Sequence, residues 1–429
     1  MLLIFSLSMM RFRRSLRSFK FGKLIVILVI LVIFLQILHM IMIARFESKD
    51  WLEKTKLPQR DRRKTLFFKS LIKSMEARIR TSHRLDNSGT YHIIDNIVLP
   101  RADRSSQDDE LSIVTQCSSN HLDYLVPLTG RWGGPVSVSV FTFDTDVNDV
   151  LYNIAYYHLC NEQIRQSTSF HLVYPIDRTP VSINSNWTIQ ATCDKKLDLG
   201  TTFGSNYDIG GIPFPHNLLR NLAIRYTKTP YVLMIDIDML PSIKLKQSFH
   251  SFFKTVRTVG TETLKTAFVL PAFEVQTDID VPSEKAELLI QWGKGNVRPF
   301  YRTACWKCQK QTQYERWKKL EPKTRLEVAY SLSWKDPWEP FFIGDKSLPD
   351  YDERFKQYGF NRISQVCEMH IAGFQFSVLN NAFLVHHGFK EPKEFHKTKE
   401  DELNKNRLLF RRFKEELKVK YPESDRRCY

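Results

Sequence analysis

The sequence lacks the cysteine and histidine spacing of a zinc site. Its single C-x-x-C motif, Cys305 to Cys308, has no second cysteine pair or histidine pair at ribbon-like distance. The residues before it, 301–304, have weak strand propensity, which disfavours a thioredoxin-like redox site. The chain has seven cysteines. We therefore predict structural disulfides with one thiol left over, as in proteins of oxidising compartments.

The chain also lacks a positively charged surface spread along its length. Its net charge is +16, but residues 1–64 carry 14 Lys and Arg against 4 Asp and Glu. The remaining residues carry 49 basic against 43 acidic side chains, an ordinary balance for a soluble surface. This distribution excludes nucleic acid as the expected partner and indicates a membrane-proximal N-terminus. Internal repeats and low-complexity tracts are absent as well.

Charge is missing altogether from residues 24–44, a run of 21 residues. This run has the length of a membrane-spanning helix, exceeds the apolar region of a signal peptide, and is followed by no small-residue cleavage site. We predict a basic cytoplasmic tail (1–23), a signal-anchor helix (24–44), a stem (45–110) that is partly helical around 65–80, and a lumenal globular domain (111–429). The sequon at Asn186 agrees with a lumenal C-terminal part.

Strand and helix patterns alternate after residue 111. Alternation of this kind predicts a mostly parallel α/β sheet. The expected strands are 135–143, 169–174, 231–235, 267–273, 374–379 and 382–385, and the expected helices are 147–166, 216–226, 243–259, 283–292 and 401–420.

The strand over residues 231–235 leads directly into Asp236 and Asp238, with a turn signal at Pro241. Two carboxylates at the carboxyl end of a buried strand can share a divalent cation such as Mn²⁺ or Mg²⁺. The D-x-D pattern alone is weak, because it also occurs at Asp144 and at Asp278. Solvated turn carboxylates explain Asp236 and Asp238 equally well.

A divalent cation held at this strand end suits a diphosphate leaving group, and other residues suit the same transfer chemistry. His386 ends the strand over 382–385 and is a candidate third ligand, and Lys390 is a candidate diphosphate contact. An inverting transfer needs a general base, for which Asp352, Glu353 and Glu368 are the acidic candidates. Each of these residues, taken singly, is explained as well by a surface or ion-pair role.

Three segments together resemble glycosyltransferase family forty-nine. They are residues 216–242, with Arg220-Asn221-Leu222-Ala223 leading into Asp236-Ile237-Asp238, residues 305–317 (CWKCQKQTQYERW), and residues 351–390, which end in HHGFK. The resemblance covers about residues 111–420. Members of that family are Golgi type II membrane proteins and include glucuronyltransferases acting on O-mannosyl glycans.

The resemblance implies a GT-A (Rossmann-like) fold and a UDP-sugar donor, most simply UDP-glucuronate, transferred to a glycan or glycoprotein acceptor with inversion. It implies Mn²⁺ or Mg²⁺ at Asp236, Asp238 and His386. Donor contacts are expected at Asp144, Arg220, Asn221 and Lys390.

Glu368 is the implied base, although the second acid of the family's E-L-D is His370 here. UDP-N-acetylglucosamine or UDP-xylose as donor, or a non-catalytic glycan-binding role, stay open. So does assembly as a homo-oligomer or with a partner transferase.

Overall fold

The computed structural model describes residues 29–45, 63–101, 111–144, 146–179, 193, 212–258, 265–391 and 399–428. Two compact units divide the chain, Met1–Phe67 and Phe68–Tyr429. The described part of the first unit includes a helix over residues 29–45. Among the described residues, no helix combines the length and the apolar character that crossing a membrane requires. The tail 1–23, residues 24–28 of the expected span, and Asn186 lie outside the described residues.

A nine-stranded sheet forms the centre of the second unit, in the order β1-β4-β3-β2-β5-β11-β7-β12-β10. Its strands are β1 (Tyr91–Val98), β2 (Leu111–Ser118), β3 (Val136–Phe141), β4 (Thr168–Pro175), β5 (Tyr231–Met234), β7 (Thr266–Leu270), β10 (Glu327–Leu332), β11 (Phe341–Asp345) and β12 (Gln375–Asn380). Strands β4, β3, β2 and β5 are parallel neighbours. The sheet is mixed rather than mostly parallel, because β11 lies antiparallel between β5 and β7.

A four-stranded sheet continues three of these strands. It contains β6 (Met239–Pro241), β13 (Leu384–His387), β8 (Ala272–Val275) and β9 (Val297–Pro299) in that order. The single strand expected over 267–273 is two strands in different sheets, divided at Pro271, which has no N–H to donate to a ladder. The chain likewise passes from β5 to β6 and from β12 to β13. Three crossings therefore meet at one end of the large sheet.

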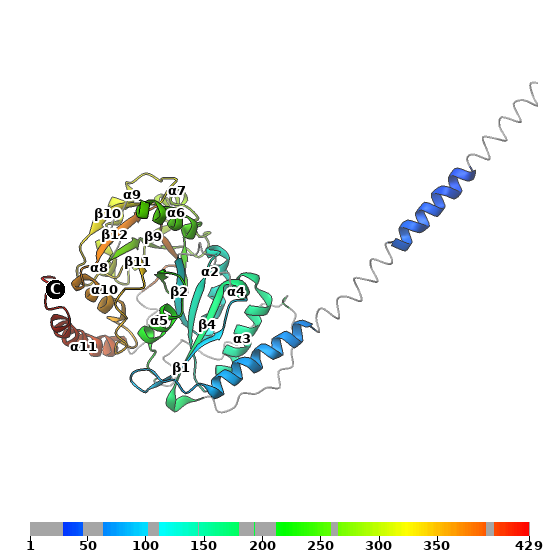
Figure 1. Ribbon diagram of the computed structural model, residues 1–429. Coiled ribbons are helices and arrows are strands. Elements are labelled where there is room, and N and C mark those ends of the chain that lie inside the picture. The colour runs from blue at the N-terminus through cyan, green and yellow to red at the C-terminus, as the bar shows by residue number, and fades with distance from the viewer. Residues whose placement is uncertain are drawn as a thin grey trace, which may run out of the picture. The chain divides into compact units, whose positions relative to one another are not determined.

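Helices cover the sheets as Figure 1 shows. They are α2 (Leu125–Trp132), α3 (Asp146–Cys160), α4 (Glu162–Ser167), α5 (His216–Arg225), α6 (Leu245–Thr258), α7 (Lys285–Gly293), α8 (Trp306–Gln309), α9 (Tyr314–Lys318), α10 (Asn361–Ile371) and α11 (Lys399–Lys420). The helix expected over 147–166 breaks at Asn161, whose side chain caps α4 by accepting a hydrogen bond from the Ile164 N–H. Helix α5 packs on β2 and β3.

The compact unit begins well before residue 111, which corrects the expected stem boundary. Within the helix over residues 63–81, Phe68, Ile72 and Met75 are buried in the main hydrophobic core. Strand β1 pairs with β4 along the edge of the large sheet. Burial of this kind stabilises a fold by roughly 1.5–3 kcal/mol for each large apolar side chain. Residues 68–98 are thus part of the sheet domain and not a tether.

Three disulfides link the described cysteines: Cys160–Cys193, Cys305–Cys308 and Cys367–Cys428. Cys117 is a buried free thiol. The prediction of structural disulfides with one thiol left over is confirmed. The C-x-x-C pair is one of these bridges and so is not available as a pair of zinc ligands.

Candidate active site

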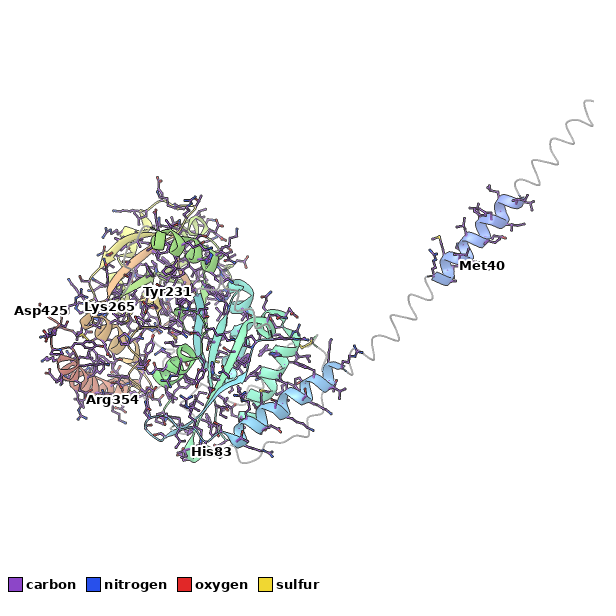
Figure 2. All side chains as sticks on the ribbon, viewed as in Figure 1. Met40, His83, Tyr231, Lys265, Arg354 and Asp425 are labelled. Atoms are coloured by element: carbon purple, nitrogen blue, oxygen red, sulfur yellow. A yellow bond between two sulfur atoms is a disulfide. The ribbon has the colours of Figure 1, made fainter. Side chains whose placement is uncertain are left out.

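The two acids of the D-x-D motif lie in the connection from the large sheet to the small one. Strand β5, which begins at Tyr231 (Figure 2), ends at Met234, and β6 begins at Met239. A turn joins them and is closed by a hydrogen bond from the Met239 N–H to the Asp236 carbonyl, 3.0 Å long. Because β5 is flanked by β2 and β11, this turn lies near the middle of the large sheet's strand order.

Strand β13 brings a histidine beside the second acid. In the antiparallel pairing of β13 with β6, His386 lies opposite Met239, the residue that follows Asp238. The Nε2 atom of His386 lies 3.2 Å from the Asp238 Oδ2 atom. Lys390 reaches the same oxygen, with its Nζ atom 3.1 Å away. The structure therefore brings His386 and Lys390, which are close together in the sequence, to one carboxylate oxygen of Asp238, which is far from both in the sequence.

The ionisation of this cluster is set by its neighbours. Burial alone would raise the pKa of the Asp238 carboxyl, but the hydrogen bond with His386 and the charge of Lys390 outweigh burial and hold that pKa well below its ordinary value. Burial likewise opposes the charge on Lys390, but Asp238 raises the pKa of its ammonium above the ordinary value. Both groups are therefore charged at neutral pH.

Asp236 is held differently. Its Oδ2 atom is 2.6 Å from Nη2 of Arg362, and its Oδ1 atom is 3.5 Å from Nη2 of Arg220. Arg362 is the second residue of α10 and Arg220 is a buried residue of α5, so two helices converge on this carboxylate. Burial works against ionisation of Asp236, but the two guanidinium groups lower its pKa below the ordinary value.

The donor atoms suit a divalent cation at Asp238 and His386. The Nδ1 atom of His386 lies 2.7 Å from the Gly388 carbonyl oxygen, a contact in which the nitrogen must donate. Nε2 then donates to Asp238 when the imidazole carries a second proton, and without that proton it presents a lone pair beside the carboxylate, as a metal-binding histidine does. Among the described residues, no three His, Cys, Asp or Glu side chains converge as a complete metal site. Asp236 is engaged by its arginines and is not gathered with the other two predicted ligands.

The ion pair between Glu274 and Arg298 holds the backbone of Lys390 in place. Glu274, on β8, is fully buried and accepts hydrogen bonds from Nε of Arg298 (2.7 Å) and from the Tyr301 N–H (2.8 Å). Arg298 in turn donates to the Lys390 carbonyl oxygen at 3.1 Å, as does the Thr303 hydroxyl at 2.9 Å. The backbone that presents Lys390 is therefore fixed by groups anchored in the small sheet.

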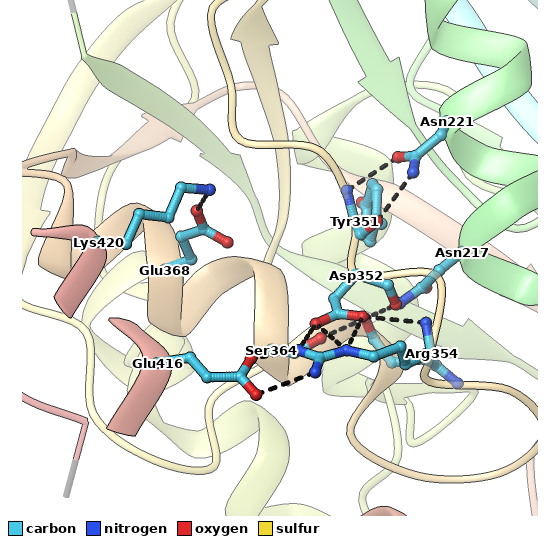
Figure 3. Close-up of polar contacts among 10 residues, drawn as sticks. Asn217, Asn221, Tyr351, Asp352, Arg354, Ser364, Glu368, Glu416 and Lys420 are labelled. Carbon is cyan, nitrogen blue, oxygen red and sulfur yellow. Dashed lines mark hydrogen bonds and ion pairs between the residues drawn. The ribbon is translucent and has the colours of Figure 1, made fainter. Parts of the chain in front are cut away.

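Glu368 does not lie in this site, which corrects its assignment as the base. Its Oε1 atom is 2.6 Å from Nζ of Lys420 and accepts a hydrogen bond from the Tyr421 hydroxyl at 2.8 Å. Figure 3 shows Glu368 pointing to Lys420 at the end of α11. Glu368 follows Arg362 by six residues, which is roughly 9 Å along a helix and about 240° around it. The two side chains therefore leave α10 on different sides.

Two predicted donor contacts have other partners. Asn221 donates to the Tyr351 carbonyl oxygen and to Glu353 and accepts a bond from the Tyr351 N–H, so its amide holds the loop before α10 (Figure 3). Asp144 follows β3 and pairs with Arg178 at 3.2 Å. Strand β3 is separated from β5 by β2.

Sequence patterns alone missed Arg362, Arg298 and Glu339. Glu339 immediately precedes Pro340 and β11, and burial raises the pKa of its carboxyl, with the charge of Asp236 acting in the same direction. The short apolar run Phe341–Ile343 after Pro340 was the signal for a buried strand here. The tryptophans and prolines that precede this run interrupt the strand pattern, so the strand was not predicted.

Comparison with known proteins adds a family to this geometry. The family described as "Glycosyl-transferase for dystroglycan" matches residues 110–422. Beta-1,4-glucuronyltransferase 1 of Danio rerio is 41% identical over 362 residues, covering 80% of this chain and 83% of the relative. Xylosyl- and glucuronyltransferase LARGE2 of Mus musculus is 26% identical over 298 residues, covering 69% of this chain and 37% of the relative.

A crystal structure of GalNAc-T7 with UDP, GalNAc and Mn2+ covers 76% of this chain and 54% of that chain, with 10% identity and a TM-score of 0.37, which is too low to support an argument. The sequence match is much stronger and extends over most of the sheet domain. The chain belongs to the glycosyltransferase family described as "Glycosyl-transferase for dystroglycan".

Proposed function

We propose that the chain is a metal-dependent glycosyltransferase that transfers glucuronate from UDP-glucuronate, with inversion, to a glycan acceptor. The observation that carries the proposal is the convergence of His386 and Lys390 on one carboxylate oxygen of Asp238, in the turn between β5 and β6. The curated relative that is 41% identical is named a glucuronyltransferase, which supports this donor. A GT-A arrangement of the α/β domain is part of the proposal.

Asp238 and His386 would hold the cation, and their carboxylate oxygen and imidazole nitrogen suit Mn²⁺. When bound, such an ion supplies Lewis-acid stabilisation of the departing diphosphate. Lys390 would contact the same diphosphate as a point charge, exchanging part of its ion pair with Asp238 for a phosphate oxygen. Because Arg298 and Thr303 hold the Lys390 backbone, the ammonium group would stay within reach of both Asp238 and the phosphate.

Asp236 has a positioning role in this proposal. It is ion-paired to both Arg362 and Arg220, and Arg220 also donates to Asn361 at 3.1 Å. These contacts connect the turn between β5 and β6 to the N-terminus of α10 and to α5. The buried guanidinium group of Arg220 and the partly buried one of Arg362 would also offset the negative charge that a nucleotide sugar brings.

The donor is tested by UDP release from a panel of UDP-glucuronate, UDP-xylose and UDP-N-acetylglucosamine, with Mn²⁺ and a mixture of glycan acceptors. Turnover with UDP-glucuronate alone is the expected result. Turnover with another donor would replace the sugar in the proposal and keep the mechanism. Binding of glycans without turnover of any donor would favour a non-catalytic lumenal glycan-binding protein.

We also propose a Golgi membrane location of type II topology, with residues 111–429 in the lumen. Three disulfides in the described domain fit an oxidising compartment. The uncharged run 24–44 behind a basic segment fits a signal-anchor. Protease protection of the C-terminal part in sealed Golgi vesicles is the expected outcome, and digestion without detergent would contradict it.

A further inference from the structure

Glu339 lies two residues before β11, the strand that pairs with β5. Strand β11 pairs antiparallel with β5, with Ile343 opposite Leu233. Because the two strands run antiparallel, the start of β11 lies beside the end of β5, and the Glu339 carboxyl is close enough to Asp236, Arg362 and Arg220 to interact with their charges. The segment that leads into β11 therefore brings a carboxylate to the edge of the site, which sequence patterns did not predict.

The backbone of Glu339 is fixed from both sides. Its N–H donates to the Cys308 carbonyl oxygen at 2.8 Å, and its own carbonyl oxygen accepts a bond from the Gln309 side chain at 3.0 Å. Gln309 is 1% exposed, and Cys308 is closed into a short loop by its disulfide with Cys305. These two hydrogen bonds attach the backbone of Glu339 to the short loop that the Cys305–Cys308 disulfide closes.

The Glu339 carboxylate makes no direct polar contact with another described residue. Within the described residues, neither a hydrogen bond nor an ion pair engages the Glu339 side chain. The groups that act on it electrostatically are Arg362, Arg220, Asp236 and Asp336, and it acts in turn on the hydroxyls of Tyr301 and Tyr358. Burial is the largest influence and raises the pKa of the Glu339 carboxyl, which strengthens it as a proton acceptor.

The other acidic candidates have partners. Glu368 is bonded to Lys420 and Tyr421, and Glu353 accepts a hydrogen bond from Asn221. Asp352 pairs with Arg354. A general base must point a carboxylate oxygen at the proton it removes, and these contacts turn the three carboxylates toward α11, Arg354 and α5.

We propose that Glu339 is the general base that deprotonates the acceptor hydroxyl; the proposal rests on the transferase function proposed above. In this step the acceptor oxygen forms a bond to the anomeric carbon of the donor sugar. The bond from that carbon to the diphosphate oxygen breaks, and its electron pair leaves with UDP. The hydroxyl proton moves to a Glu339 carboxylate oxygen and is later lost to solvent.

The test compares Glu339→Gln with Glu368→Gln in the full chain. Glutamine keeps the size of the side chain and removes its basicity. Rates of sugar transfer to a glycan acceptor and the dissociation constant of UDP-glucuronate are measured for each variant. We expect Glu339→Gln to lower kcat by roughly 10²–10⁴-fold, the usual contribution of a positioned base, and to leave donor affinity within about 3-fold. Glu368→Gln should keep wild-type kcat.

A second variant separates chemistry from folding. Glu339→Asp keeps a carboxylate one methylene further back, so it should recover part of the lost rate, which a purely structural role would not predict. Wild-type kcat in Glu339→Gln, or a donor affinity that falls as far as kcat, would overturn the assignment. Absence of transfer by the wild-type chain with every donor would overturn the transferase proposal as well.

Discussion

Replacing Arg298 with alanine tests whether the small sheet supports the donor site. The change leaves Glu274, which is fully buried, with the Tyr301 N–H as its remaining partner among the described residues. Removing one member of a buried ion pair costs about 3–5 kcal/mol. The remaining hydrogen bond places this case at about 3 kcal/mol, the lower end of that range.

The assay is urea unfolding of the sheet domain, followed by titration with UDP. The unfolding midpoint should fall by roughly 1 M for a slope of about 3 kcal/mol/M. UDP affinity should fall too, because Arg298 no longer holds the Lys390 carbonyl. The matched control is Arg302→Ala, since Arg302 is an exposed arginine of the same segment that stacks on Trp306.

The double variant Glu274→Gln/Arg298→Ala removes the stranded charge and should be more stable than Arg298→Ala alone. Equal midpoints for Arg298→Ala and Arg302→Ala would refute the reasoning, because they would mean that Glu274 needs no counter-ion. Unchanged UDP affinity in a destabilised Arg298→Ala would refute only the link to Lys390.

Three further predictions concern other parts of the domain. His386→Ala should weaken Mn²⁺ binding, measured by electron paramagnetic resonance, by at least about 10-fold, while His387→Ala, at an exposed neighbour, should not. Replacing both Cys367 and Cys428 with serine should cost about 4 kcal/mol of unfolding free energy, from the chain entropy of a loop with a sequence separation of 61; an unchanged denaturation midpoint would contradict it. Asp86→Asn should destabilise the domain at pH 7. Burial opposes ionisation of Asp86, but hydrogen bonds from Ser88, Tyr91 and Thr90 lower its pKa below 3.8. The stability contributed by the carboxylate is therefore complete above that value and disappears as pH falls through the lower folded-state pKa. The difference in unfolding free energy between wild type and Asp86→Asn should therefore shrink as pH falls. A difference independent of pH would contradict the account.

The sequence predicted the part of the site that local patterns encode. The apolar run of β5, the acids after it and the strand before His386 were all visible as short patterns bounded by turns. That Asp238 and His386 meet depends on the pairing of β6 with β13. The family resemblance supplied that link, because no local pattern reports a pairing between segments about 150 residues apart.

The errors also have physical causes. Glu368 has apolar neighbours in sequence, as a catalytic acid would, but α11 packs against α10 and supplies Lys420 as its partner. The charged surface of residues 68–98 resembled a stem, since burial of one helix face and pairing of an edge strand leave many polar side chains outside. Glu339 was hidden because the strand that positions it follows prolines and tryptophans.

The most direct measurement of the central claim is UDP release from UDP-glucuronate by the wild-type chain after chelation with EDTA and again after Mn²⁺ is restored, beside the Asp238→Asn variant. The account predicts loss of turnover in EDTA, full recovery with Mn²⁺, and little recovery in the variant. Turnover that persists in EDTA, or equal turnover by Asp238→Asn, would contradict the claim that Asp238 and His386 form the metal-binding centre of a glucuronyltransferase.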